Sequence, residues 1–248
     1  MSLPGTLVLA AHGSRDPRFA STARRVTDAV RVALPGVRVE LSYLDLNEPL
    51  IGDVLETLSG EAVVVPLLFG DGFHAKIDLP ALIADASAAD PALHVRQTPV
   101  IGRHSPVPAL VDRLRQAGTA DEDGVLMIAV GSSDAESDAQ IMARGDELAA
   151  ALGQPVRTVF ATRIGRDGAV VREAVESLIA AGSPRVAVSS LFLSAGLLTE
   201  RVERVVDSID LPSVVAGPIG AHRTLIDAIV SEYSAAWAVP TGPVPAPA

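Results

Sequence analysis

Two histidines and one acidic residue each follow an apolar run of the sequence, and together they could hold a metal ion. His12 ends the run LVLAAH, Asp45 follows VRVELSYL, and His74 follows AVVVPLLF and a glycine-rich loop. If these runs are parallel strands of one sheet, their carboxyl ends meet at one edge. Two neutral imidazoles and a carboxylate with open coordination positions suit a divalent first-row metal such as Fe²⁺ or Co²⁺.

Each of these residues also has an ordinary structural interpretation. Either histidine can be a loop residue that hydrogen-bonds to the backbone, and Asp45 can cap the helix that follows it. The chain contains no cysteine, so a closed structural zinc site of the usual kind is not expected. The occurrence of all three residues at one predicted sheet edge is what favours a functional site.

The strand and loop that carry His12 belong to a segment that is repeated later in the chain. LVLAAHGSRD (7–16) is matched by VLMIAVGSSD (125–134), with Val130 at the position of His12. A repeat of this kind indicates two copies of one structural unit. The sequence therefore predicts a first repeat with the histidine and a second repeat without it.

Two further segments extend the repeat. An offset of 124 residues places Gly196 on Gly72 and Leu198 on His74, and PVIGRH matches GPIGAH near the end of each half. The predicted boundaries are 1–119 for the first repeat and 120–238 for the second. The tail, 239–248, is Pro-rich and is expected to be disordered.

Each half alternates short, valine-rich runs with amphipathic stretches, a pattern typical of βα units around a parallel sheet. We therefore expect an α/β fold with two similar open parallel-sheet domains that face a central cleft. The helical patterns of the first half cover roughly 17–33, 49–59, 76–88 and 105–117.

Composition limits the classes of function. The chain has 248 residues, 48% of them hydrophobic, and a formal net charge of −10. The negative charge argues against general binding to nucleic acids or membrane surfaces. No apolar run approaches the ~20 residues of a membrane span, and the N-terminus lacks the basic region of a signal peptide. We expect a cytoplasmic protein.

The segments AHGSRDPRFA (11–20) and PLLFGDGFHAKIDLP (66–80) resemble the signature segments of the sirohydrochlorin chelatases, which include cobaltochelatases and ferrochelatases. The resemblance covers nearly the whole chain, because long members of that family are also tandem repeats. It implies that His12 and His74 are the metal and catalytic residues. The family places a glutamate where this chain has Asp45, a shorter acid that reaches less far toward a metal.

The implied reaction is insertion of a divalent metal into a sirohydrochlorin-type tetrapyrrole with loss of two protons, in siroheme or cobalamin biosynthesis. It needs no organic cofactor, and the metal is a substrate. Histidine can deliver the metal and accept protons near neutral pH. The resemblance also implies a chelatase-type fold, and we expect the protein to act as a monomer.

The tetrapyrrole is rich in carboxylates, so an acidic protein must place local positive charge in the cleft. Arg15 and Arg18 follow His12, and Lys76 follows His74. The backbone N–H groups of Gly13 and Ser14, near a predicted helix start, can also bind an anion. The alternative is that these cations are ordinary surface charges.

Three other histidines are left outside the predicted site. His104 and His222 hold the same place in the two repeats, before a helix, which indicates a shared structural role such as capping; His94 lies in a predicted strand. Two alternative functions stay open: a non-catalytic protein that binds metal or tetrapyrrole, and a chelatase for another tetrapyrrole. The sequence does not decide between iron, cobalt and nickel.

Overall fold

The protein consists of two four-stranded parallel sheets, each flanked by helices. The computed structural model describes residues 5–70, 72 and 74–238, with His74 and Ala75 described in their backbone only. The strand order is β2-β1-β3-β4 in the first sheet and β6-β5-β7-β8 in the second. The predicted α/β class with two similar parallel sheets is confirmed; the predicted disordered tail, 239–248, lies outside the described residues.

The first repeat contains β1 (Thr6–Ala11), α1 (Pro17–Ala33), β2 (Val39–Tyr43), α2 (Ile51–Glu56), β3 (Gly60–Pro66), η1 (His74–Asp78), α3 (Leu79–Ala89), β4 (Leu93–Gln97), η2 (Ile101–Arg103) and α4 (Val107–Gln116). The second contains β5 (Gly124–Ala129), α5 (Ala135–Leu152), β6 (Val156–Phe160), η3 (Arg166–Gly168), α6 (Ala169–Ala180), β7 (Val186–Ser190), α7 (Leu197–Asp207), β8 (Ser213–Val215) and α8 (Arg223–Ala238).

The strand registers of the two sheets give the correspondence between the repeats. Leu7 of β1 pairs with Val63 of β3, and Val125 of β5 pairs with Ala187 of β7. Positions in the first strands therefore differ by 118 and positions in the third strands by 124. These are the offsets that the sequence predicts, so Val130 corresponds to His12.

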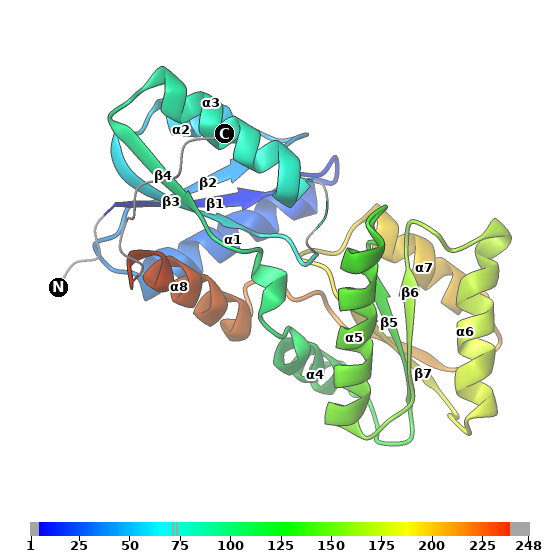
Figure 1. Cartoon of the computed structure of the whole chain (residues 1–248). Helices are drawn as coiled ribbons and strands as arrows, with labels where there is room; N and C mark the ends of the chain where they lie inside the picture. Colours follow the sequence, from blue (N-terminus) through cyan, green and yellow to red (C-terminus); the bar gives the residue numbers. More distant parts are fainter. Residues whose placement is uncertain (1–4, 71, 73, 239–248) are drawn as a thin grey trace.

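The last helix of each repeat packs on the other repeat's sheet. Helix α8 contacts α1 and β3 of the first domain, whereas α4 contacts α5 and β7 of the second. Figure 1 shows this exchange: α8, in red, lies beside α1, and α4, in green, lies beside α5. The two spatial domains therefore differ from the two sequence repeats by a reciprocal exchange of one helix.

Histidines before the exchanged helices join the two repeats. The ring of His104 contacts the Glu232 carboxylate at 2.7 Å, and His222 contacts Asp112 at 3.3 Å. His222 Nδ1 also accepts a hydrogen bond from Thr224 N at 3.2 Å, which confirms the predicted capping role for this residue. His104 instead links η2 to α8, so capping is the wrong interpretation for His104.

One continuous core runs through the exchange and fixes the two sheets relative to each other. Leu7 and Leu9 of β1 belong to the same buried cluster as Met127 of β5 and Tyr233 of α8. The outer faces of the two sheets carry separate cores, covered by α2 and α3 in the first domain and by α6 and α7 in the second. Among the described residues, no helix has the length and apolar character to cross a bilayer.

Candidate functional site

His12 and Asp45 lie side by side at the carboxyl edge of the first sheet. His12 directly follows β1, and its main-chain oxygen accepts a hydrogen bond from Asp45 N at 3.0 Å. One residue earlier, Leu44 N donates to Ala11 O at 2.8 Å, which continues the β1–β2 pairing beyond the strands. The sheet itself therefore holds these two predicted site residues together.

Gly13 allows the loop after β1 to fold tightly against the end of β2. Its φ is +101°, and a Cβ built there would lie 1.8 Å from the main-chain oxygen of Asp45. A side chain at this position would collide with the backbone of Asp45. That backbone can move away only if the loops of His12 and Asp45 separate. Gly131, at the same position in the second repeat, has a φ of +88°, and a Cβ there would lie 2.9 Å from side-chain atoms of Phe160 and Thr162.

The residues that the two repeats share after the glycine start a helix. Ser14 Oγ accepts from Asp16 N at 3.1 Å, and Asp16 Oδ1 accepts from Arg18 N at 3.0 Å, which caps α1. Ser132 and Asp134 make the same two bonds at the start of α5. Because both repeats keep these bonds, the Ser and Asp side chains are explained by capping.

The backbone N–H of Ser14 is occupied, in contrast to its predicted role as a free anion donor. It donates to Asn47 Oδ1 at 2.7 Å. Asn47 ties the His12 loop to the loop after β2 and is a residue that sequence reasoning missed. Its only sequence signal is its place two residues after Asp45.

The Asp45 side chain does not cap the following helix. Its Oδ1 accepts a hydrogen bond from Leu46 N at 2.7 Å, while the N-cap of α2 is Leu50, which makes no side-chain cap bond. Asp45 is exposed, and within the described part of the chain this bond uses one of its two carboxylate oxygens. Asp45 is therefore not a helix cap, and its carboxylate lies at the carboxyl edge of the first sheet.

His74 begins η1, a π-helical turn after β3, so its backbone is at the same end of the sheet as His12. Its side chain lies outside the described residues, and its place beside the His12 ring stays a prediction. Among the side chains that the structure describes, no three His, Asp or Glu residues form a group that could hold a metal. π-helical turns occur frequently at functional sites.

The three predicted cations differ in their partners. Arg15 is exposed and makes no hydrogen bond or ion pair with the described residues. Arg18 binds both Asp16 oxygens, at 2.9 and 2.6 Å, and its guanidinium lowers the pKa of Asp16 to about 2. Arg18 also binds Glu200 of the second domain at 2.6 Å.

Lys76 likewise binds the second domain. Its Nζ lies 2.8 Å from Asp134 Oδ2 and 3.6 Å from Glu136 Oε2, and the hydrogen bond with Asp134 raises the lysine pKa. The sequence predicted the two cations at positions 18 and 76 but not their acidic partners. Of the three predicted cations, Arg15 alone makes no ion pair with the residues that the structure describes.

The corresponding edge of the second repeat has the same backbone without the histidine. Val130 is 45% exposed, and its main-chain oxygen accepts from Thr162 N at 3.2 Å, as His12 O accepts from Asp45 N. Leu198 packs against the core under α6 and α7. A valine, a threonine and a leucine thus stand where the first repeat has its three predicted metal ligands.

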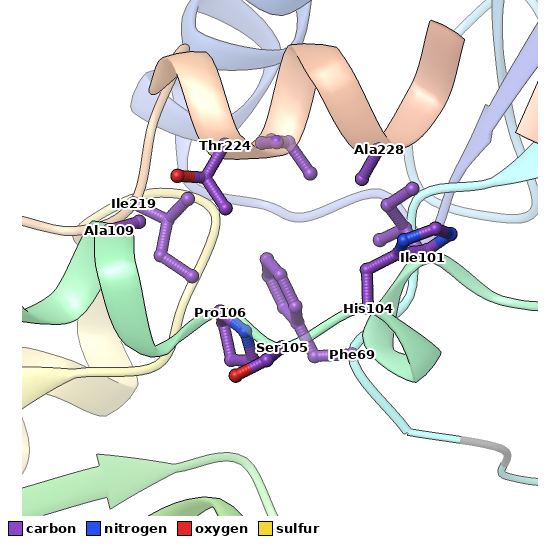
Figure 2. A pocket seen from close by; sticks show the side chains of 10 residues that line it. Phe69, Ile101, His104, Ser105, Pro106, Ala109, Ile219, Thr224 and Ala228 are labelled. Atoms are coloured by element: carbon purple, nitrogen blue, oxygen red, sulfur yellow. The ribbon is translucent and has the colours of Figure 1, made fainter. Parts of the chain in front are cut away.

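Two cavities lie elsewhere in the molecule. The first is a space of about 20 Å³ at the helix exchange, where Phe69, His104 and Thr224 converge (Figure 2). This is room for about one water molecule. The second is an open groove of about 570 Å³ lined by Arg25 and Arg113. Neither cavity is lined by His12, Asp45 or Lys76.

The sequence matches the CbiX family model twice, over residues 6–117 and 124–236. Two curated relatives are the sirohydrochlorin cobaltochelatase of Priestia megaterium, 24% identical over 89% of this chain and 76% of its own, and the sirohydrochlorin ferrochelatase of Bacillus subtilis, 25% identical over 89% and 87%.

A solved structure supports the same fold. The sirohydrochlorin chelatase SirB from Bacillus subtilis subspecies spizizenii, in complex with cobalt, superposes with a TM-score of 0.76 and 22% identity over 94% of this chain and 95% of its own. The two family matches coincide with the two halves that share strand order, register and loop geometry. The chain therefore belongs to the CbiX family, the family of the sirohydrochlorin chelatases.

Proposed function

We propose that this protein is a metal chelatase that inserts Fe²⁺ or Co²⁺ into a sirohydrochlorin-type tetrapyrrole. The observation that carries the proposal is the position of His12. It lies at the carboxyl end of a central strand and is joined through the backbone to Asp45. Arg18, in the helix that follows, binds Glu200 of the second domain. Family membership and the names of both relatives support the same reaction.

The reaction exchanges two pyrrole N–H protons for one divalent metal ion. A neutral imidazole at His12 can bind the incoming metal and can accept a proton near neutral pH. We assign His74 the same two abilities, and we assign Asp45 the role of a third oxygen ligand or of a proton acceptor. The carboxylate of Asp45 is one methylene shorter than a glutamate and reaches less far toward a metal. Its Oδ1 is held by Leu46 N, so we assign the metal-facing role to Oδ2.

The second repeat is proposed to serve as a substrate wall. Val130 is exposed at the edge where His12 lies in the first repeat, and an apolar side chain suits contact with the face of a macrocycle. One chain supplies both walls, so we propose that the protein works as a monomer. The same proposal includes a cytoplasmic location and no organic cofactor.

Anaerobic absorption spectroscopy tests the reaction. The protein is mixed with sirohydrochlorin and with Co²⁺ or Fe²⁺, and the spectrum is followed against an enzyme-free control. We expect conversion to the metallated spectrum at a rate proportional to protein concentration. A spectrum that only shifts at once and then stays constant identifies a binding protein and refutes the chelatase.

Arg15→Ala is expected to raise the KM for sirohydrochlorin about three- to tenfold while kcat changes less. Arg15 is exposed, follows His12 by three residues and makes no bond to the described part of the protein, so its guanidinium is available to a substrate carboxylate. A contact that is equal in the ground state and the transition state changes KM rather than kcat. Steady-state kinetics at about 50 mM and 500 mM salt measure the effect, which screening should reduce.

The matched control for this variant is Arg38→Ala. Arg38 is exposed at the amino end of β2, at the opposite edge of the same sheet, and pairs with Glu40. The control removes the same charge and should leave KM unchanged. Equal effects of the two variants, or a loss of kcat alone for Arg15→Ala, would remove Arg15 from substrate binding.

A further inference from the structure

Two groups of ion pairs connect the domains beside the candidate site. Arg18 Nη1 lies 2.6 Å from Glu200 Oε1 of α7. Lys76 Nζ lies 2.8 Å from Asp134 Oδ2 and 3.6 Å from Glu136 Oε2, at the start of α5. In both groups the first domain supplies the cation and the second domain supplies the acid.

The repeat relates these two groups to each other. The offset of 118 places Glu136 on Arg18, and the offset of 124 places Glu200 on Lys76. The pair between positions 18 and 200 is therefore the pseudo-symmetric copy of the pair between positions 136 and 76. If the second repeat carried the same residues as the first, the cation at position 18 of one repeat would face the cation at position 76 of the other. The second repeat carries an acid at both positions, so the charge is reversed where the halves meet.

These ion pairs are accessible to an exchanging anion. The side chains of Arg18, Glu200 and Lys76 are 48%, 41% and 43% exposed. Ion pairs with this exposure stabilise a protein little, because water and salt screen them. Asp16 holds two other nitrogens of the Arg18 guanidinium, so this cation stays in place if Glu200 leaves.

We propose that Glu200, Asp134 and Glu136 form a clasp that pairs with Arg18 and Lys76 in the absence of substrate. The carboxylates of the substrate then replace these three acids as partners of the two cations. This inference rests on the proposed function, because it takes a carboxylate-rich tetrapyrrole as the incoming anion. The acids then reserve the cations for a ligand with enough carboxylates to displace both groups at once.

The clasp makes substrate binding a competition. The measured affinity is the intrinsic affinity multiplied by the fraction of protein whose cations are free. Removing the competing acids must therefore tighten binding. If the ion pairs only held the domains in a binding-competent position, the same change would weaken binding. The two interpretations predict opposite signs for one measurement.

The test compares the Glu136→Gln/Glu200→Gln double variant with the wild-type protein. The two side chains lie outside the capping bonds of α5 and α7, and Asp134 is kept because it caps α5, so the folds should be equal, as checked by thermal denaturation. The probe is uroporphyrin, a stable carboxylate-rich porphyrin, titrated by absorbance at about 50 mM salt. We expect roughly two- to tenfold tighter binding by the variant. The difference should vanish near 500 mM salt.

A control variant corrects for net charge. Asp28→Asn/Asp227→Asn makes the same charge change, but Asp28 pairs with Arg31 within α1 and Asp227 pairs with Arg223 within α8. If the clasp variant binds uroporphyrin no tighter than this control, the clasp is wrong while the proposed function stands. If wild-type protein binds no uroporphyrin and inserts no cobalt into sirohydrochlorin, the proposed function fails as well.

Discussion

His12→Ala is expected to lower the rate of cobalt insertion into sirohydrochlorin by at least about 100-fold while the protein stays folded. The side chain is half-buried at the end of β1, outside the three cores, so its loss creates no core cavity. A positioned general base alone contributes on the order of 10² to 10⁴ to a rate. The measurement is the initial rate of metallation under anaerobic conditions, with circular dichroism and thermal denaturation as the check on folding.

Val130→Ala is the matched control for this variant. Val130 is the corresponding residue of the second repeat, with the same backbone bond to the neighbouring strand end. It should retain turnover, with at most a change in KM if the side chain contacts the macrocycle. Near-normal turnover of His12→Ala at subsaturating metal would mean that His12 is neither the ligand nor the base. His74→Ala is expected to match His12→Ala.

Gly13→Ala is expected to destabilise the protein by about 3 kcal/mol or more and to abolish activity with it. The new Cβ would lie 1.8 Å from a backbone oxygen of Asp45, and the φ of +101° is strained for any other residue. Relief requires that the His12 loop and the Asp45 loop separate, which takes the site apart. Urea unfolding monitored by circular dichroism measures the change in the free energy of unfolding.

Gly36→Ala separates backbone strain from collision. Gly36 has a similar φ, +87°, but a Cβ there meets no atom within 4 Å. Its cost should be about 1 kcal/mol, from the positive φ alone. If both variants lose the same stability, the close approach of Gly13 to Asp45 does not hold the site together.

Most of the fold can be predicted from the sequence, because the patterns that indicate its helices and strands lie within short segments and occur twice, once in each repeat. The helix expected at 17–33 is α1 at those bounds, and the offsets of 118 and 124 recur in the strand registers. The exchange of α4 and α8 was not predictable in this way. An amphipathic helix has the same pattern of apolar residues whether it packs on its own sheet or on the other.

The site was predicted only in part, for physical reasons that differ by residue. His12 and Asp45 come together because parallel strands end at one edge, which a sequence pattern can show. The bond from Ser14 N to Asn47 joins two loops, and loop conformation has no periodic signal. The acids that face Arg18 and Lys76 are at least 58 positions away in the chain, so no local pattern connects them to these cations. Aligning the repeats does reveal the reversed charge at Glu136 and Glu200.

A titration of the metal-free protein with Co²⁺ tests the central claim most directly, because that claim places one metal site at the strand ends of the first repeat. Isothermal titration calorimetry under anaerobic conditions gives the number of sites per chain. We predict one site in the wild-type protein, the same site in Val130→Ala, and no site in His12→Ala. Two equivalent sites per chain, or a site that His12→Ala retains with unchanged affinity, would contradict the account.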